Sequence, residues 1–402
     1  MLFIILYHFL FFWDMYANPF NYCRGELAHQ FFPSFIHLGR GERSDPYYWL
    51  NYKAHPMLAS FYPPHWILAR LTTKLSLNLR YKLLLYLVTL HKLFEGIGWY
   101  LLFGGGTLGI LCSISLTYLS FTLRNEPAIS YTVSWIPWML LGNSISIGMM
   151  FLAGYYPVVV MASLLWLIKP NIIQAILGLV IGLPQIVPFL KYLPKTVKRT
   201  LGGKLPEWED QWYFGVVPLF FLSFSYSSLL ILIPFFMSIG LLKVPLTRLP
   251  KRWMYLTIII LFLTSIHGNV PLWLLLIHAT DILRNRRQLI PSPYIETARK
   301  PSLFFGTTLA RFLENCKGRV SGLPYPLYTG AINRIKTMGY CGCMQNKLMS
   351  KWRGGDDHHD WFQYHEDSPA LDSYRVQYAY TRKKIGWNYT GIKNLYRNPR
   401  FQ

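Results

Sequence analysis

Apolar residues occur along this chain in long runs that are separated by short polar breaks. A helix needs about 20 apolar residues to cross the hydrocarbon core of a membrane. Runs close to that length predict eight or nine membrane-spanning helices, some of them half-length. The expected spans are residues 2–16, 83–103, 107–123, 131–153, 157–168, 172–190, 212–242 and 253–283, the last two being long for one span and short for two.

Residues 17–81 are mixed in polarity and rich in proline, and they are predicted to form one long loop. The segment "HPMLASFYPPHW" at 55–66 is too apolar for an ordinary solvated loop. Its paired prolines, Pro63 and Pro64, exclude a helix interior at that point because proline lacks a backbone donor. The glycine triplet at 104–106 is followed by no Lys-Ser/Thr pair, so we expect a turn rather than a phosphate-binding loop.

Residues 284–402 contain no apolar run that is long enough to span a membrane. Short strands and turns are predicted over 319–355, with an amphipathic helix near 344–352, and residues 376–391 alternate in polarity as a strand does. The predicted fold class is therefore an all-α polytopic membrane domain, residues 1–283, with a small α/β appendage outside the membrane.

Composition and charge agree with a membrane protein. Apolar residues make up 52% of the chain, and 14% of residues are charged, against roughly 25% in soluble domains. The net charge is +22, and residues 284–402 hold 20 Lys and Arg against 8 Asp and Glu. A basic segment attached to a membrane domain suits anionic lipid headgroups. It carries no recognised nucleic-acid module, so we expect it to bind lipid and not nucleic acid.

Basic residues also predict the orientation in the membrane, because they collect in cytoplasmic loops. The densest run of Lys and Arg between expected spans lies at 191–204. This run is expected to be cytoplasmic, which makes the 17–81 loop extracytoplasmic. Four basic residues near the end of that loop argue against this orientation: Arg70, Lys74, Arg80 and Lys82.

The long loop resembles the first extracytoplasmic loop of the bacterial YfhO-type membrane proteins, which belong by fold with the GT-C glycosyltransferases. An acid, a Gln, a proline-aromatic step and a Phe-Tyr-Pro-Pro segment follow one another as in that family. The residues that carry the resemblance are Glu26, Gln30, Pro33, Asp45, Pro46, Trp49, His55, Pro56, Ala59, Phe61, Tyr62, Pro63 and Pro64. Looser matches extend it over about residues 1–275, and the family's usual Asp is replaced here by Glu26.

The resemblance implies transfer of a sugar from a polyprenyl-phosphate donor to a cell-envelope acceptor, at the outer face of the bacterial inner membrane. Two other functions stay open. One is a non-catalytic membrane scaffold or lipid-binding assembly factor. The other is a transporter, which Gly and Pro interruptions in the apolar runs would suit.

The resemblance also implies roles for individual residues of the loop. A carboxylate near the membrane surface can take the proton of the attacking acceptor hydroxyl. Glu26 is the first candidate for this base, and Asp45 is the second. Arg24 and His55 are candidates for contact with the leaving phosphate, whose charge a divalent ion such as Mg²⁺ or Mn²⁺ could also stabilise.

Aromatic and ionisable residues complete the set of candidates. Trp49 and Tyr62 are expected either to stack on a sugar or lipid or to anchor the loop at the membrane interface. His91 and Glu95 lie four residues apart on one face of the expected second span, with Lys92 adjacent. They predict either a salt-bridged structural pair or a contact with a lipid phosphate. The cluster "DDHHDWFQYHED" at 356–367 has the residue types of a metal site but no organising spacing, which favours a solvated turn.

Overall fold

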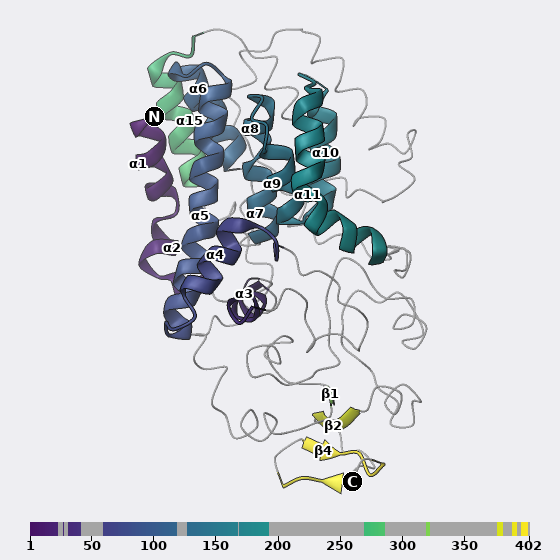
Figure 1. Ribbon diagram of the computed structural model, residues 1–402. Coiled ribbons are helices and arrows are strands. Elements are labelled where there is room, and N and C mark those ends of the chain that lie inside the picture. Colours follow the sequence, from purple (N-terminus) through teal and green to yellow (C-terminus); the bar gives the residue numbers. More distant parts are fainter. Residues whose placement is uncertain are drawn as a thin grey trace, which may run out of the picture. The chain divides into compact units, whose positions relative to one another are not determined.

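The computed structural model is mostly helical, with a few short strands near the C-terminus (Figure 1). It describes residues 1–22, 27, 31–41, 59–118, 127–167, 169–192, 269–285, 319–321, 376–380, 388–391 and 395–400. The expected span at 212–242, the helix near 344–352 and the cluster at 356–367 lie outside the described residues.

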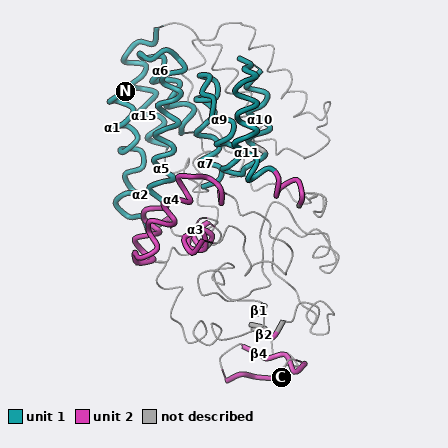
Figure 2. The backbone as a smooth tube through the Cα atoms, in the orientation of Figure 1, with its two compact units in different colours: residues 1–19, 85–186, 205–295 teal, residues 20–84, 187–204, 296–402 magenta. Residues whose placement is uncertain are grey.

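The chain divides into two compact units, which Figure 2 colours separately. Unit 1 takes in residues 1–19, 85–186 and 205–295, and unit 2 takes in residues 20–84, 187–204 and 296–402. The division between residues 84 and 85 falls inside one helix, α5 (Leu77–Leu102), which therefore contributes to both units.

The first part of unit 1 brings the N-terminal helices together with a helix from the far end of the same unit. These helices are α1 (Leu2–Phe11), α2 (Trp13–Ala17), α6 (Gly106–Thr117) and α15 (Leu272–Arg284). The Tyr7 hydroxyl donates to the Ala279 carbonyl over 2.8 Å, which joins α1 to α15. A second bond, 2.9 Å between Ser115 Oγ and His278 Nε2, joins α6 to α15. Hydrogen bonds of this kind hold helices together where water is excluded.

Three short helices replace the single span that was predicted at 131–153, so that prediction was wrong. They are α7 (Pro127–Ser134), α8 (Ile136–Leu140) and α9 (Ser146–Ala153). Pro137 sits in the first turn of α8, where its missing donor is tolerated, and the preceding helix ends before it. Gly142 has a φ of 86°, a left-handed conformation that ends α8 before Asn143.

The remaining helices of unit 1 follow the predicted spans more closely. They are α10 (Tyr156–Trp166) and α11 (Ile172–Tyr192), whose residues from 187 onward belong to unit 2. Among the described residues, one helix is long and apolar enough to cross a membrane by itself, namely Ile172–Lys191. The expected turn at 104–106 is confirmed: all three glycines have positive φ, and α6 begins at the third.

Unit 2 contains helices inside the region that was predicted to be one long loop, so that prediction was wrong over its described part. They are η1 (Pro19–Tyr22), α3 (Phe32–Gly39), α4 (Pro63–Leu71) and the first turns of α5. Pro63 and Pro64 open α4 rather than interrupt it, because the first turn of a helix needs no proline donor.

A small sheet confirms that short strands occur near the C-terminus. Two strands lie within the single strand expected over 376–391, and a strand at 395–397 was not predicted. The strands of the sheet are β1 (Arg319–Ser321), β2 (Val376–Tyr380), β3 (Asn388–Tyr389) and β4 (Leu395–Arg397). They lie in the order β1-β2-β4-β3, in which β1 and β2 are parallel and the other pairs are antiparallel.

Helices α9 and α11 approach closely at two glycines. A Cβ atom added to Gly148 would lie 2.5 Å from Ile181 Cβ, and one added to Gly178 would lie 2.6 Å from Ile147 Cβ. These distances are shorter than contacts between real carbon atoms, so the two helices can pack at this separation because both positions lack a side chain.

We expect Gly178→Ala to destabilise the protein by about 1–3 kcal/mol, because the added methyl group forces α9 and α11 apart. Thermal unfolding of the full chain in detergent measures the effect. Leu179→Ala is the matched control on the exposed side of the same helix and should change the unfolding temperature less. Equal unfolding temperatures for Gly178→Ala and the unmodified protein would contradict the close approach.

Candidate functional site

Three of the predicted site residues lie in the described part of the chain: Tyr62, His91 and Glu95. The other five fall outside it, and their assignments stay predictions: Arg24, Glu26, Asp45, Trp49 and His55. His91 and Glu95 belong to unit 1 and Tyr62 to unit 2, so each unit is described by itself.

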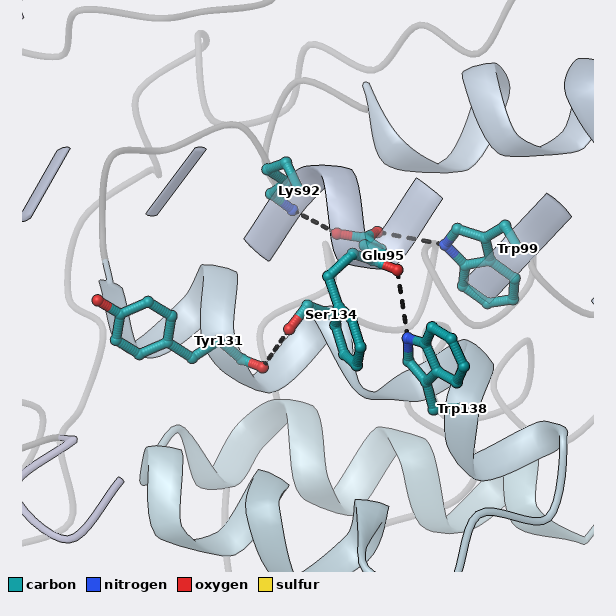
Figure 3. Close-up of polar contacts among 7 residues, drawn as sticks. Lys92, Glu95, Trp99, Tyr131, Ser134 and Trp138 are labelled. Carbon is teal, nitrogen blue, oxygen red and sulfur yellow. Dashed lines mark hydrogen bonds and ion pairs between the residues drawn. The ribbon is translucent and has the colours of Figure 1, made fainter. Parts of the chain in front are cut away.

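A buried ion pair occupies the middle of α5. Lys92 Nζ lies 2.8 Å from Glu95 Oε2, and the two side chains are only 2% and 1% exposed. The indole Nε1 of Trp99 donates to the other carboxylate oxygen over 3.3 Å. Figure 3 shows the carboxylate of Glu95 between these two donors. Residues three and four apart meet on one helical face, so α5 supplies both partners of Glu95 by itself.

His91 makes its contacts elsewhere. Its Nδ1 lies 2.7 Å from the Leu87 carbonyl, which can only accept, so this nitrogen carries a hydrogen. Its ring packs against Tyr131 of α7 with ring centroids 4.3 Å apart. The cation paired with Glu95 is therefore the neighbouring Lys92 and not His91, which corrects the partner that the four-residue spacing suggested. The pair that forms is a buried ion pair within one helix, as in the first of the two alternatives considered for this helical face.

Two glycines next to the ion pair let other helices approach α5. Ser113 Oγ on α6 donates to the Gly96 carbonyl over 2.8 Å, and a Cβ on Gly96 would lie 3.2 Å from that hydroxyl. A Cβ on Gly98 would lie 2.8 Å from both Pro137 Cγ and Trp138 Nε1 on α8.

The indole of Trp138 fixes α8 against α5 in a second way. Its Nε1 donates to the Phe94 carbonyl over 3.2 Å, and its ring stacks on that of Phe94 with centroids 4.6 Å apart. The Phe94 carbonyl lies inside α5, so this bond fixes the position of α8 along the axis of α5. Helices α6 and α8 therefore both contact α5 at residues next to the ion pair.

A serine and a histidine also meet inside unit 1, which raises the question of hydrolytic chemistry. Ser115 Oγ and His278 Nε2 are 2.9 Å apart, and Asp281 follows one turn later. However, His278 Nδ1 has no hydrogen-bond partner among the described residues. The acid of a Ser-His-Asp triad holds the histidine through that nitrogen. This contact is therefore better explained as a bond between helices α6 and α15.

Tyr62 lies in unit 2 directly before α4. Its side chain is fully buried, and its backbone N–H donates to the Ala59 carbonyl over 3.1 Å. Ala59 has a φ of 60°, a conformation that non-glycine residues rarely adopt and that suits the tight turn here. Tyr62 therefore stabilises the turn before Pro63. Its stacking on a sugar or lipid stays a prediction.

Neither metal-binding groups among the described residues nor related proteins assign a function to the site. Among the described residues, no three His, Cys, Asp or Glu side chains gather as the ligands of a metal ion would, so the divalent ion stays a prediction. Comparison of the chain with protein-family models, with curated proteins and with solved structures finds no match.

We expect Lys92→Met to destabilise the protein by about 3–5 kcal/mol, because it leaves the Glu95 carboxylate buried without a cation. The double variant Lys92→Met/Glu95→Gln should recover most of the loss, since the amide oxygen still accepts from Trp99. Chemical or thermal unfolding of the full chain in detergent measures both. Losses that simply add in the double variant would show that the two side chains do not interact.

Proposed function

We propose that the chain is a multi-pass protein of the bacterial inner membrane. The support is the distribution of polarity in unit 1. Large apolar side chains are exposed along α1, α11 and α15, among them Leu2, Leu6, Ile173, Val180 and Trp273, while Lys92, Glu95, His8 and His278 are buried. In water such extended apolar surfaces are rare. In a bilayer they would contact lipid tails, and the interior would hold the polar groups.

Within this class we propose transfer of a sugar from a polyprenyl-phosphate donor to a cell-envelope acceptor. The observation that carries the proposal is the ordered series of residues from Glu26 to Pro64, which resembles the first loop of YfhO-type proteins. The arrangement of the described residues is compatible with it. The Phe-Tyr-Pro-Pro segment opens helix α4, and the long helix α5 follows six residues after α4 ends.

In the proposed reaction an acceptor hydroxyl attacks the anomeric carbon of the donor sugar. The bond from that carbon to the phosphate oxygen breaks, and the phosphate leaves with the electron pair. Glu26 takes the proton of the hydroxyl, with Asp45 as the second candidate. Arg24 and His55 stabilise the charge that develops on the leaving phosphate, and Trp49 holds the sugar by stacking.

A non-catalytic scaffold or lipid-binding assembly factor is the second candidate. It is favoured by the ion pair in α5, because Glu95 already has two donors from its own helix and Lys92 is engaged by it. In this alternative α5 is a structural helix, and the chain binds a lipid without changing it. A transporter remains the third candidate, supported by the interruption of the 127–153 segment into three helices.

We expect Glu26→Gln to lower the rate of sugar transfer by about 10²- to 10⁴-fold, the usual contribution of a general base. The substitution keeps the shape of the side chain and removes the group that ionises. Transfer from a polyprenyl-phosphate sugar by the purified full chain measures the rate, and Glu26→Asp should keep part of it, since the related pattern has Asp there.

Two results would contradict parts of this proposal. Normal turnover by Glu26→Gln would exclude Glu26 as the base and leave Asp45 as the next residue to substitute. Failure of the unmodified protein to transfer sugar from any polyprenyl-phosphate donor would exclude the enzymatic function and favour the lipid-binding scaffold. Glu42→Gln, a carboxylate of the same loop outside the resembling series, is the matched control and should leave turnover unchanged.

A further inference from the structure

Unit 2 carries a concentration of positive charge that its described residues do not balance. Its described segment from residue 20 to residue 84 contains no Asp or Glu. The same segment contains five basic residues: Arg40, Arg70, Lys74, Arg80 and Lys82. Lys82 lies over the ring of Phe20, with Nζ 5.2 Å from the ring centroid, whereas three of the others converge on α3.

Arg80 is the unusual member of this group, because it is buried. Its side chain is 6% exposed, and its guanidinium lies over the Phe35 ring at 5.7 Å from the centroid. Two of its donors, Nε and Nη2, have no hydrogen-bond partner among the described residues. Burial lowers the pKa of Arg80, and the positive charge of Arg40 lowers it further. A guanidinium stays protonated in proteins, so this site holds a buried charge that no described residue compensates, which is costly.

The segment Gly39-Arg40-Gly41 at the end of α3 brings the arginines together. A Cβ on Gly39 would lie 2.5 Å from Arg80 Nη2 and 2.7 Å from the Ala69 carbonyl of α4. Gly41 has a φ of 97°, and a Cβ there would lie 2.8 Å from Arg70 Nη2. The guanidinium groups of Arg80 and Arg70 therefore pack against two glycines, which precede and follow Arg40 in the sequence.

Exposed apolar side chains flank Arg70 and Arg80 in the sequence. Large apolar side chains are exposed every four residues from α4 into α5, at Ile67, Leu71, Leu75 and Leu79, and Leu71 is 76% exposed. Arg70 stands beside Leu71 in sequence. Exposed apolar residues next to cations are typical of helices that lie in the headgroup layer of a membrane. This pattern favours a lipid over a soluble anion as the partner of the arginines.

We propose that Arg80, with Arg40 and Arg70, binds the phosphate group of a membrane lipid at the Gly39-Arg40-Gly41 segment. A guanidinium presents its donors as a planar fork, which suits the oxygens of a phosphate group. The ligand supplies the negative charge that the described residues of this unit lack. That the lipid is the polyprenyl-phosphate donor rests on the proposed function, whereas the phosphate site itself does not.

Binding of polyprenyl monophosphate to the purified full chain in detergent, followed by tryptophan fluorescence, tests the site. We expect Arg80→Met to weaken binding by about tenfold to a hundredfold, because it removes charged hydrogen bonds to the phosphate. Arg80→Lys should lie in between, since it keeps the charge and loses the fork. Lys74→Met removes the same charge from an exposed position six residues away and should change the affinity less than about twofold.

Stability without ligand separates binding from a structural role. Removal of an uncompensated buried charge should leave the unfolding temperature of Arg80→Met unchanged or raise it. Unaltered affinity in Arg80→Met, or an equal loss in Lys74→Met, would overturn the site. A lowered unfolding temperature with a proportionate loss of all binding would also overturn it, by showing that Arg80 is structural.

Two further ligands identify the source of the phosphate. Phosphatidylglycerol bound as tightly as polyprenyl monophosphate would support a site for ordinary phospholipid, and inorganic phosphate bound as tightly would overturn the assignment to a lipid. The outcome is independent of catalysis. If the unmodified protein binds the lipid through Arg80 and transfers no sugar, the proposed function fails and this site stands. If the unmodified protein transfers sugar and Arg80→Met binds the lipid normally, this site fails and the proposed function stands.

Discussion

The ion pair between Lys92 and Glu95 is the interaction on which the rest of unit 1 depends. Two charges inside an apolar helix are tolerated only if they compensate each other and if water is kept from competing. Helix α5 meets the first condition with its own residues, and Trp99 adds a third group. The second condition requires neighbouring helices to come close, and Gly96 and Gly98 allow α6 and α8 to do so.

The two units treat buried charge in opposite ways. In unit 1 each charge of the Lys92–Glu95 pair has a partner on the same helix, so the pair contributes to structure and needs no ligand. In unit 2 the buried guanidinium of Arg80 has an aromatic ring and a second cation near it, and no acid among the described residues. A charge that a protein balances internally holds the fold, whereas a charge that it leaves unbalanced is a better guide to a ligand.

Local patterns predicted the elements that depend on local causes. The apolar runs predicted α5, α10 and α11, and the glycine triplet predicted the turn at 104–106. The apolar runs failed at proline and glycine, although these are also local signals: Pro63 and Pro64 open α4 inside the supposed loop, and Pro137 and Gly142 break the supposed span at 131–153. Spacing placed Glu95 on a shared face but could not choose Lys92 over His91. The burial of Arg80 depends on α3, forty residues away, and no local pattern records it.

The most direct measurement is an experimental structure of the full chain in a lipid nanodisc that contains polyprenyl monophosphate. We expect ordered lipid tails along the exposed apolar side of α11 and a phosphate within hydrogen-bonding distance of the Arg80 guanidinium. Phosphate bound away from the Gly39-Arg40-Gly41 segment, with Arg80 paired to a carboxylate of the chain, would contradict this expectation.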